Sequence, residues 1–124
     1  MRICKTFRWE AGHHLKLPYP SPCNNQHGHS YLVELEVEGN INPHTGMIVD
    51  FAVIKKIMNN KSISFDHKNI NKEISHFRKK NPTAENLVLY LKKKLDEVWK
   101  APKIKIRRIR VWETQTGYAE EVWE

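Results

Sequence analysis

The chain has 124 residues, of which 40% are hydrophobic and 28% charged, and its formal net charge at pH 7 is +7. This length and composition predict a single globular domain over residues 1–124 and exclude a disordered or fibrous chain. No apolar stretch approaches the roughly 20 residues that span a bilayer, which excludes a membrane helix.

The first residues read directly as a strand, without the pattern of a secretory signal, and we expect a cytoplasmic protein. The two cysteines, Cys4 and Cys23, are then expected to be free thiols. The positive charge predicts attraction to anions. It does not distinguish nucleic acid, a membrane surface and a phosphorylated small molecule.

Two strands are predicted at the start of the chain. Residues 2–13 place apolar side chains in one phase of a two-residue period and polar ones in the other, which indicates a half-buried strand. Residues 15–26 are rich in proline and asparagine, which favours a loop. From Ser30 to Glu38, valine and leucine alternate with glutamate, which predicts a second strand that ends at Gly39.

Two helices are predicted next. Asp50 is expected to cap a short helix that begins at Phe51. Thr83 is expected to cap a longer helix that ends before Ala101 and Pro102. Residues 59–82, which lie between the two helices, are polar and are interpreted as a connection.

Two further strands are predicted at the end of the chain. In residues 104–113 the apolar phase changes after Ile106, which predicts a bulge near Arg107. A last short strand is expected from Tyr118 to Trp123. The order is therefore two strands, two helices and two strands, which is typical of an α+β fold.

Three histidines form a candidate metal site. His27 and His29 flank Gly28 at the start of the second strand, so their side chains point the same way, about 6 to 7 Å apart. A catalytic zinc ion typically takes three protein ligands. His13 is the preferred third ligand because it ends the first strand in phase with its apolar face, whereas His14 points to the opposite face. Loop histidines that make ordinary hydrogen bonds are the alternative.

Other groups are candidates for acid and base chemistry. Cys23 lies four residues before His27, where positive charge would favour its thiolate, although an inert loop cysteine is the alternative. Asp66 beside His67 can relay protons near neutral pH, or can belong to a surface turn. Glu113 is expected to face inward or into a cleft, where its carboxylate needs donors from an amidine-like ligand edge or from Arg or Lys.

Basic residues concentrate on the strand predicted for residues 104–113. They are interpreted mainly as a solvated face, with some available to a phosphorylated ligand and a nucleic-acid stripe as the remaining option. The residues are Lys103, Lys105, Arg107, Arg108 and Arg110.

Six segments in order carry a family resemblance: WEAGHHL, CNNQHGHSY, HTGMIVDF, FDHKNIN, NPTAENL and VWETQTGYA. Over nearly its whole length the chain resembles the family of 6-carboxy-tetrahydropterin synthases and 6-pyruvoyl-tetrahydropterin synthases. The resemblance implies an α+β T-fold, or tunnelling fold, with a four-stranded antiparallel sheet, two helices on one face and the order ββααββ. It also implies a homohexamer made of two trimers, with active sites between subunits.

The resemblance also implies roles for the candidate residues. It implies Zn2+ held by three ligands, His13, His27 and His29. It implies that Cys23 is the proton acceptor and that Asp66 with His67 forms a proton relay. It implies that Glu113 anchors the pterin and also takes part in that relay. It places three more residues near the pterin ring, Thr83, Glu85 and Thr114.

Spacing within the family points to a subtype. Three residues separate Cys23 from the HGH segment, as in the bacterial 6-carboxy enzymes of queuosine synthesis, whereas the 6-pyruvoyl enzymes usually have five. The implied activity is a zinc-dependent lyase that converts 7,8-dihydroneopterin triphosphate to 6-carboxy-5,6,7,8-tetrahydropterin, acetaldehyde and triphosphate. The alternatives are a 6-pyruvoyl-tetrahydropterin synthase, a zinc hydrolase, and a non-enzymatic, metal-stabilised module that binds nucleic acid. The expected partner is a small pterin triphosphate. No membrane partner is expected, and nucleic acid is disfavoured.

Overall fold

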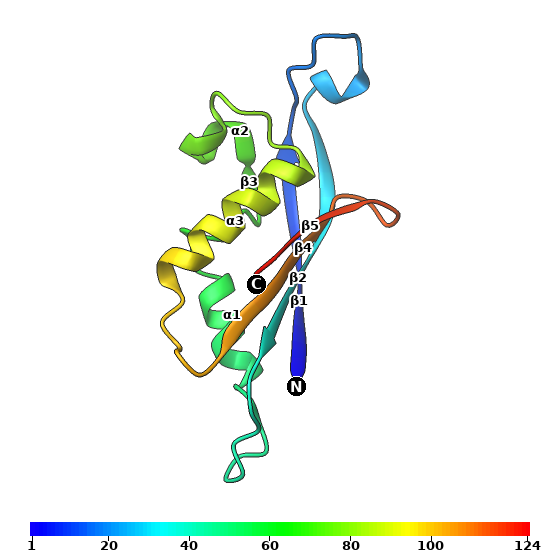
Figure 1. The fold of residues 1–124 in the computed structure, drawn as a ribbon. Coiled ribbons are helices and arrows are strands. Elements are labelled where there is room, and N and C mark those ends of the chain that lie inside the picture. The colour runs from blue at the N-terminus through cyan, green and yellow to red at the C-terminus, as the bar shows by residue number, and fades with distance from the viewer.

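The computed structural model describes all 124 residues and contains five strands, three α-helices and two short 3-10 helices (Figure 1). In chain order these are β1 (Arg2–His13), η1 (Pro22–Asn24), β2 (His27–Glu38), α1 (Phe51–Met58), β3 (Lys68–Asn69), α2 (Ile70–Glu73), η2 (Ser75–Phe77), α3 (Ala84–Val98), β4 (Lys105–Trp112) and β5 (Tyr118–Val122).

The strands form one sheet in the order β3-β1-β2-β4-β5. The four long strands are antiparallel neighbours, whereas β3 runs parallel to β1 beside Ala11 and Gly12. The α+β class is therefore confirmed. The expectation of four strands in the order ββααββ is corrected, because the short β3 and the one-turn helix α2 lie between the two predicted helices.

The segment 59–82 is more than a polar connection. It buries five apolar side chains in the core: Ile63, Phe65, Ile70, Ile74 and Phe77. These residues sit in short turns rather than on one long helix or strand, so they produce no sustained period that a sequence pattern would reveal.

Local sequence signals elsewhere agree with the structure. The Asp50 carboxylate accepts a hydrogen bond from the backbone N–H of Ala52 at 2.8 Å, and the Thr83 hydroxyl accepts one from Asn86 at 3.1 Å. Both helices thus begin at the predicted caps. The predicted bulge is also confirmed, because Glu36 pairs with Arg108 and Val37 pairs with Ile106, which leaves Arg107 as the extra residue.

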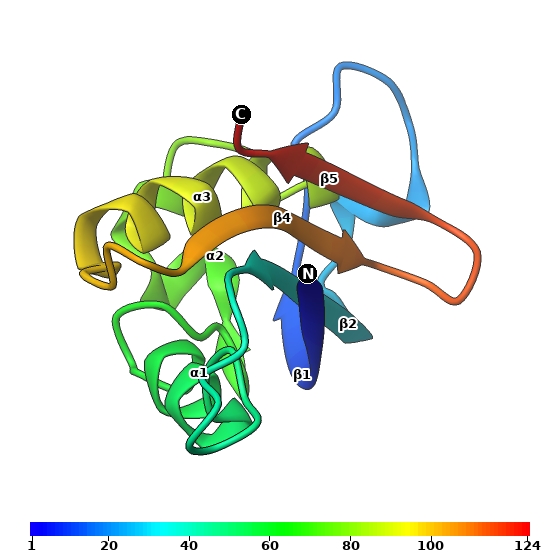
Figure 2. The ribbon, with the colours of Figure 1, turned by 60° about the horizontal axis from the view of Figure 1, so that its bottom comes forward.

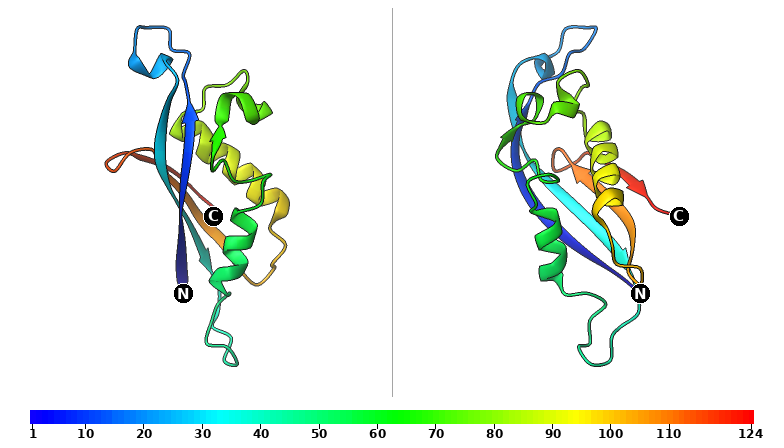
Figure 3. Two further views of the ribbon diagram at one scale, coloured as in Figure 1. Left: turned by 180° about the vertical axis from the view of Figure 1, so that it is seen from behind. Right: turned by 90° about the vertical axis from the view of Figure 1, so that its left-hand side faces the viewer.

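All three α-helices cover the same face of the sheet (Figures 2 and 3). The phase of β1 and β2 that faces them is buried, from Phe7 to His13 and from Tyr31 to Val37. Helix α3 closes this core with Leu87, Val88, Leu91 and Leu95. No helix combines the length and the hydropathy needed to cross a lipid bilayer.

The other face of the sheet is open and carries a network of ion pairs. Arg108 reaches Glu36 at 3.0 Å and Arg107 reaches Glu38 at 2.8 Å. Arg110 lies 2.7 Å from Glu120. The three arginines of β4 are therefore paired with glutamates of neighbouring strands and only partly exposed, whereas a mainly solvated basic face was expected.

Candidate metal centre

The register of β1 and β2 brings three histidines together. His13 pairs directly with His27 and Ala11 pairs with His29, so all three imidazoles project from one face at the end of the two strands. One ligand nitrogen of each lies within 4.8 Å of the other two. The sequence prediction that His13, and not His14, joins the pair from β2 agrees with this geometry.

Backbone carbonyls orient two of the rings. The Nδ1–H of His13 donates to the carbonyl of Pro82 at 2.8 Å, and the Nδ1–H of His27 donates to the carbonyl of Asn25 at 2.7 Å. A carbonyl can only accept, so Nδ1 carries the proton and the lone pair is left on Nε2. Such bonds are the usual means by which proteins fix the tautomer of a metal-binding histidine.

The Nε2 atom of His13 is buried and has no hydrogen-bond partner. Buried polar atoms in proteins are normally satisfied, so this nitrogen lacks a partner that the site is built to receive. Its surroundings are two more imidazoles, with ring centroids at 4.5 Å for His27 and 5.0 Å for His29. A divalent cation that prefers nitrogen ligands fits this donor set, and zinc is the commonest such ion.

The electrostatics favour the neutral, metal-binding form of the imidazoles. Burial, opposed by the hydrogen bond to the Pro82 carbonyl and reinforced by the neighbouring His27 and His29, lowers the pKa of His13 to about 4. Burial also lowers the pKa of His29, although Glu113 opposes this shift. Both lone pairs are therefore available at neutral pH without the loss of a proton.

Glu113 extends toward the three histidines just beyond the end of β4. Its Oε1 lies 3.7 Å from Nε2 of His13 and 3.9 Å from Nε2 of His29, and its side chain is one-third exposed. This position agrees with the expectation of a carboxylate that faces inward or into a cleft, because Glu113 points to the buried His13. Its carboxylate adds negative charge beside the nitrogens that would hold a cation.

Two asparagines clamp the chain just after His13. Asn71 exchanges hydrogen bonds with the backbone N–H and carbonyl of His14, at 2.9 and 3.0 Å. Asn81 does the same with Lys16, at 2.7 and 3.2 Å. The sequence analysis missed both residues, because a side-chain amide that replaces a missing strand partner leaves no periodic signal.

Cys23 lies in η1, within the loop that projects beyond the end of β1 and β2 (Figure 1). The loop is closed at its base, where the backbone N–H of Leu15 donates to the carbonyl of Cys23 at 2.8 Å. A second bond joins the N–H of Leu17 to the side chain of Asn24 at 2.9 Å. The thiol of Cys23 is exposed and makes no hydrogen bond to the three histidines.

Asp66 and His67 lie at the edge of β1. Asp66 accepts a hydrogen bond from the backbone N–H of Glu10 at 2.8 Å and lies 3.0 Å from Nδ1 of His67. His67 has a positive φ of 59° and a side chain that is 80% exposed. The two residues form a pair, as predicted, but within one chain His67 points to solvent and has no contact with the three histidines.

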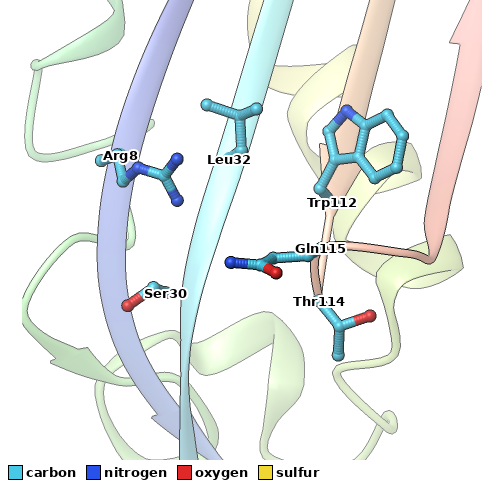
Figure 4. A pocket seen from close by; sticks show the side chains of 6 residues that line it. All are labelled: Arg8, Ser30, Leu32, Trp112, Thr114 and Gln115. Carbon is cyan, nitrogen blue, oxygen red and sulfur yellow. The ribbon is translucent and has the colours of Figure 1, made fainter.

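The remaining predicted residues surround the site at different distances. Thr83 caps α3 directly after Pro82, and Glu85 is exposed in the first turn of that helix. Thr114 lines a pocket on the open face of the sheet, where Arg8 of β1 and Gln115 extend toward one another across β2 (Figure 4). The structure thus places Thr83 beside the residue that orients His13, and Thr114 on the other side of the sheet.

Comparisons with known proteins agree on one family. A family model described as 6-pyruvoyl tetrahydropterin synthase matches residues 2–122. A protein of Rickettsia bellii named 6-carboxy-5,6,7,8-tetrahydropterin synthase is 28% identical over 137 residues, which cover 97% of this chain and 99% of that protein. Human 6-pyruvoyl tetrahydrobiopterin synthase is 36% identical over 98 residues, which cover 77% of this chain and 66% of the human protein.

The fold is also shared with solved structures. The 6-pyruvoyl tetrahydropterin synthase of Caenorhabditis elegans superposes with a TM-score of 0.86 at 26% identity, covering 100% of this chain and 96% of that one. The present chain therefore spans almost the full length of the nematode structure and the rickettsial relative, and about two thirds of the human protein.

The three histidines should bind one divalent metal ion per chain. Replacing His29 with alanine removes one of three ligands and should weaken Zn2+ binding by more than about 100-fold, since loss of an outer hydrogen-bond partner alone costs 10–100-fold. Metal content after dialysis and competition with a chromogenic chelator would measure the change. The control is His44→Ala, because His44 is exposed in a distant loop. Equal metal content in the two variants would contradict the site.

The stability of the metal-free protein should fall on acidification. His13 has a pKa of about 4 in the folded chain and 6.5 in the reference state, so between these pH values the unfolded chain binds a proton that the folded chain does not. The free energy of unfolding should decrease as the pH drops through this window, as measured by urea denaturation in the presence of a chelator. His13→Gln should flatten the decrease and His44→Gln should not. A wild-type stability that rises from pH 6.5 to 4 would oppose this account.

Proposed function

The chain belongs to the 6-pyruvoyl tetrahydropterin synthase family, and on that premise we propose that it is a zinc-dependent lyase acting on 7,8-dihydroneopterin triphosphate. With the uptake of one water, the proposed products are 6-carboxy-5,6,7,8-tetrahydropterin, acetaldehyde and triphosphate, in the synthesis of queuosine and related 7-deazapurines. The family name and the names of the relatives support a pterin substrate. The finer assignment is our inference.

One observation carries the proposal. The buried Nε2 of His13 has no hydrogen-bond partner and faces two more imidazoles that have free lone pairs. A nitrogen in this position stabilises the fold only when a cation or a donor occupies the space in front of it. A zinc ion bound there would supply a Lewis acid that acidifies the hydroxyls and adjacent C–H bonds of the substrate side chain.

The residues of the chain would do the remaining work. Glu113 binds the pterin through two parallel hydrogen bonds from its exocyclic amine and ring N–H, and so orients the side chain toward the histidines. The Cys23 thiolate removes a proton from a side-chain carbon, the C–O bond to the triphosphate breaks, and His67, held by Asp66, returns a proton. One water adds to the side chain, and cleavage of its first C–C bond leaves a carboxyl carbon on the pterin and releases the other two carbons as acetaldehyde. The electron pair lost by the carboxyl carbon reduces the dihydropterin ring to the tetrahydropterin, so no external oxidant or reductant is needed. Thr83, Glu85 and Thr114 are proposed to lie near the pterin ring.

A second subunit would complete the site. Within one chain, Cys23 and His67 are exposed and neither contacts the three histidines. An acid and base pair that acts on a bound substrate must come within hydrogen-bond reach of it, directly or through one water. We therefore propose that neighbouring subunits supply these groups, in a homohexamer of two trimers.

The spacing between Cys23 and His27 favours the 6-carboxy product over the 6-pyruvoyl product, which remains the alternative within the family. The ion pairs on the open face of the sheet argue against a module that binds nucleic acid. The β4 arginines on which such a module would depend are already paired with Glu36, Glu38 and Glu120. Phosphates would have to displace these carboxylates before they could bind there.

Turnover should depend on Cys23. The zinc-loaded protein, incubated with 7,8-dihydroneopterin triphosphate, should release acetaldehyde and 6-carboxy-tetrahydropterin, identified by mass. Cys23→Ala should reduce the rate by about 100-fold or more, because it removes the proton acceptor. Cys4→Ala is the control, since Cys4 is the other free cysteine and lies at the far end of β1. An unchanged rate in Cys23→Ala would remove that residue from the mechanism, and a 6-pyruvoyl product would select the alternative.

Mixing two inactive variants should restore activity if the site is shared between subunits. We expect Cys23→Ala and His67→Ala to be inactive alone and to regain part of the wild-type rate after they are unfolded together and refolded into mixed oligomers. Some mixed sites would then hold an intact Cys23 from one subunit and an intact His67 from another. Oligomer size would be followed by light scattering. Mixed oligomers that form but stay inactive would mean that both groups act from the same chain.

A further inference from the structure

A pocket with unpaired cations lies beside the segment that follows His13. It has a volume of about 180 Å³, and its lining includes Asn71, Phe77 and Asn81. The rest of the lining is four exposed cations, Lys16, Arg78, Lys79 and Lys80, and this group is called the basic pocket below. None of the four forms an ion pair with an aspartate or glutamate.

The basic pocket differs in this respect from the other arginine-rich region. On β4, Arg107 and Arg108 each donate two hydrogen bonds to one glutamate oxygen, of Glu38 and Glu36 respectively. An anion that arrives there must displace a carboxylate that is already well bonded. In the basic pocket no carboxylate forms an ion pair with the four cations, so an arriving anion has only water and dissolved ions to displace.

The positive potential extends over the neighbouring surface. Burial lowers the pKa of His76, and the charges of Lys80, Lys93 and Lys94 lower it further. Lys80 of the basic pocket and two lysines of α3 thus contribute positive potential near η2. Such a field concentrates anions at the surface and speeds their arrival.

The pocket is built on the same clamp that fixes the candidate metal centre. Asn81 holds the backbone of Lys16, and the next residue, Pro82, accepts the hydrogen bond from His13. Lys16 follows His13 by three residues, so their Cα atoms are at most about 10 Å apart. A triphosphate that extends from a three-carbon side chain held at the histidines covers a distance of this order.

We infer that the basic pocket binds the triphosphate group of the substrate, an assignment that rests on the proposed function. Arg78 presents a planar fork that can bond two phosphate oxygens at once, and the three lysines add mobile point charges. Triphosphate is also a proposed product. The same pocket therefore holds the leaving group, and inorganic tripolyphosphate competes with the substrate for it.

Binding of inorganic tripolyphosphate to the zinc-loaded protein, followed by isothermal titration calorimetry, tests the inference directly. The triple variant Arg78→Gln, Lys79→Gln, Lys80→Gln should bind it at least about tenfold more weakly, because each lost charged hydrogen bond costs more than a neutral one. The affinity of the wild type should fall as salt is added. In turnover assays the triple variant should show a raised KM for the pterin triphosphate.

A matched control removes the same charge elsewhere. Lys55, Lys56 and Lys61 are exposed, lie on or just after α1, and form no ion pair. Their triple change to glutamine lowers the net charge by the same amount and should leave tripolyphosphate affinity within about twofold of the wild type, because none of the three lines the basic pocket. Equal losses in the two triple variants, or none in either, would overturn the inference.

The outcome separates this inference from the proposed function. If the wild type turns over the pterin triphosphate but its KM and tripolyphosphate affinity are insensitive to the Arg78, Lys79 and Lys80 changes, the pocket assignment is wrong and the function stands. If tripolyphosphate binding is lost in that variant while no pterin product forms with the wild type, the pocket is an oligophosphate site and the proposed reaction is wrong.

Discussion

The antiparallel register between β1 and β2 is the constraint on which the candidate metal centre depends. His13 opposite His27, with His29 two residues further along β2, brings three imidazoles to one face. A slip of one residue would turn a whole strand over and send its ligands to the open face. The same alternation buries Trp9 and Tyr31 in the core. A shifted register would expose these side chains, so their burial stabilises the register that brings the three histidines together.

Much of the fold follows from signals that lie within one element. The alternation in β1 and β2, the Asp50 and Thr83 caps and the bulge at Arg107 all depend on neighbouring residues, and each could be predicted. The segment 59–82 could not be predicted, because its buried residues are held by contacts with the rest of the core. The pairing of β4 arginines with glutamates of β2 also depends on which strand becomes the neighbour, which is a tertiary outcome.

The candidate site divides in the same way. The three histidines could be proposed from parity alone, because strand geometry dictates where alternate side chains point. The carbonyls of Pro82 and Asn25 that orient two of the rings come from irregular backbone, and no residue type signals them. Within one chain, neither Cys23 nor His67 contacts the three histidines. Their joint role in catalysis therefore stays a prediction that depends on the assembly of several subunits.

Hydrogen bonds close the base of the loop after β1, and they separate the tip of this loop from the three histidines at the ends of β1 and β2. The Leu15 to Cys23 bond and the Leu17 to Asn24 bond join the two arms before the tip begins. Residues 18–20, which precede the Ser21 cap of η1, can therefore be lengthened, shortened or replaced without moving the histidines at the foot of the arms. This segment is a natural point for related sequences to diverge, and a suitable place to insert a reporter peptide.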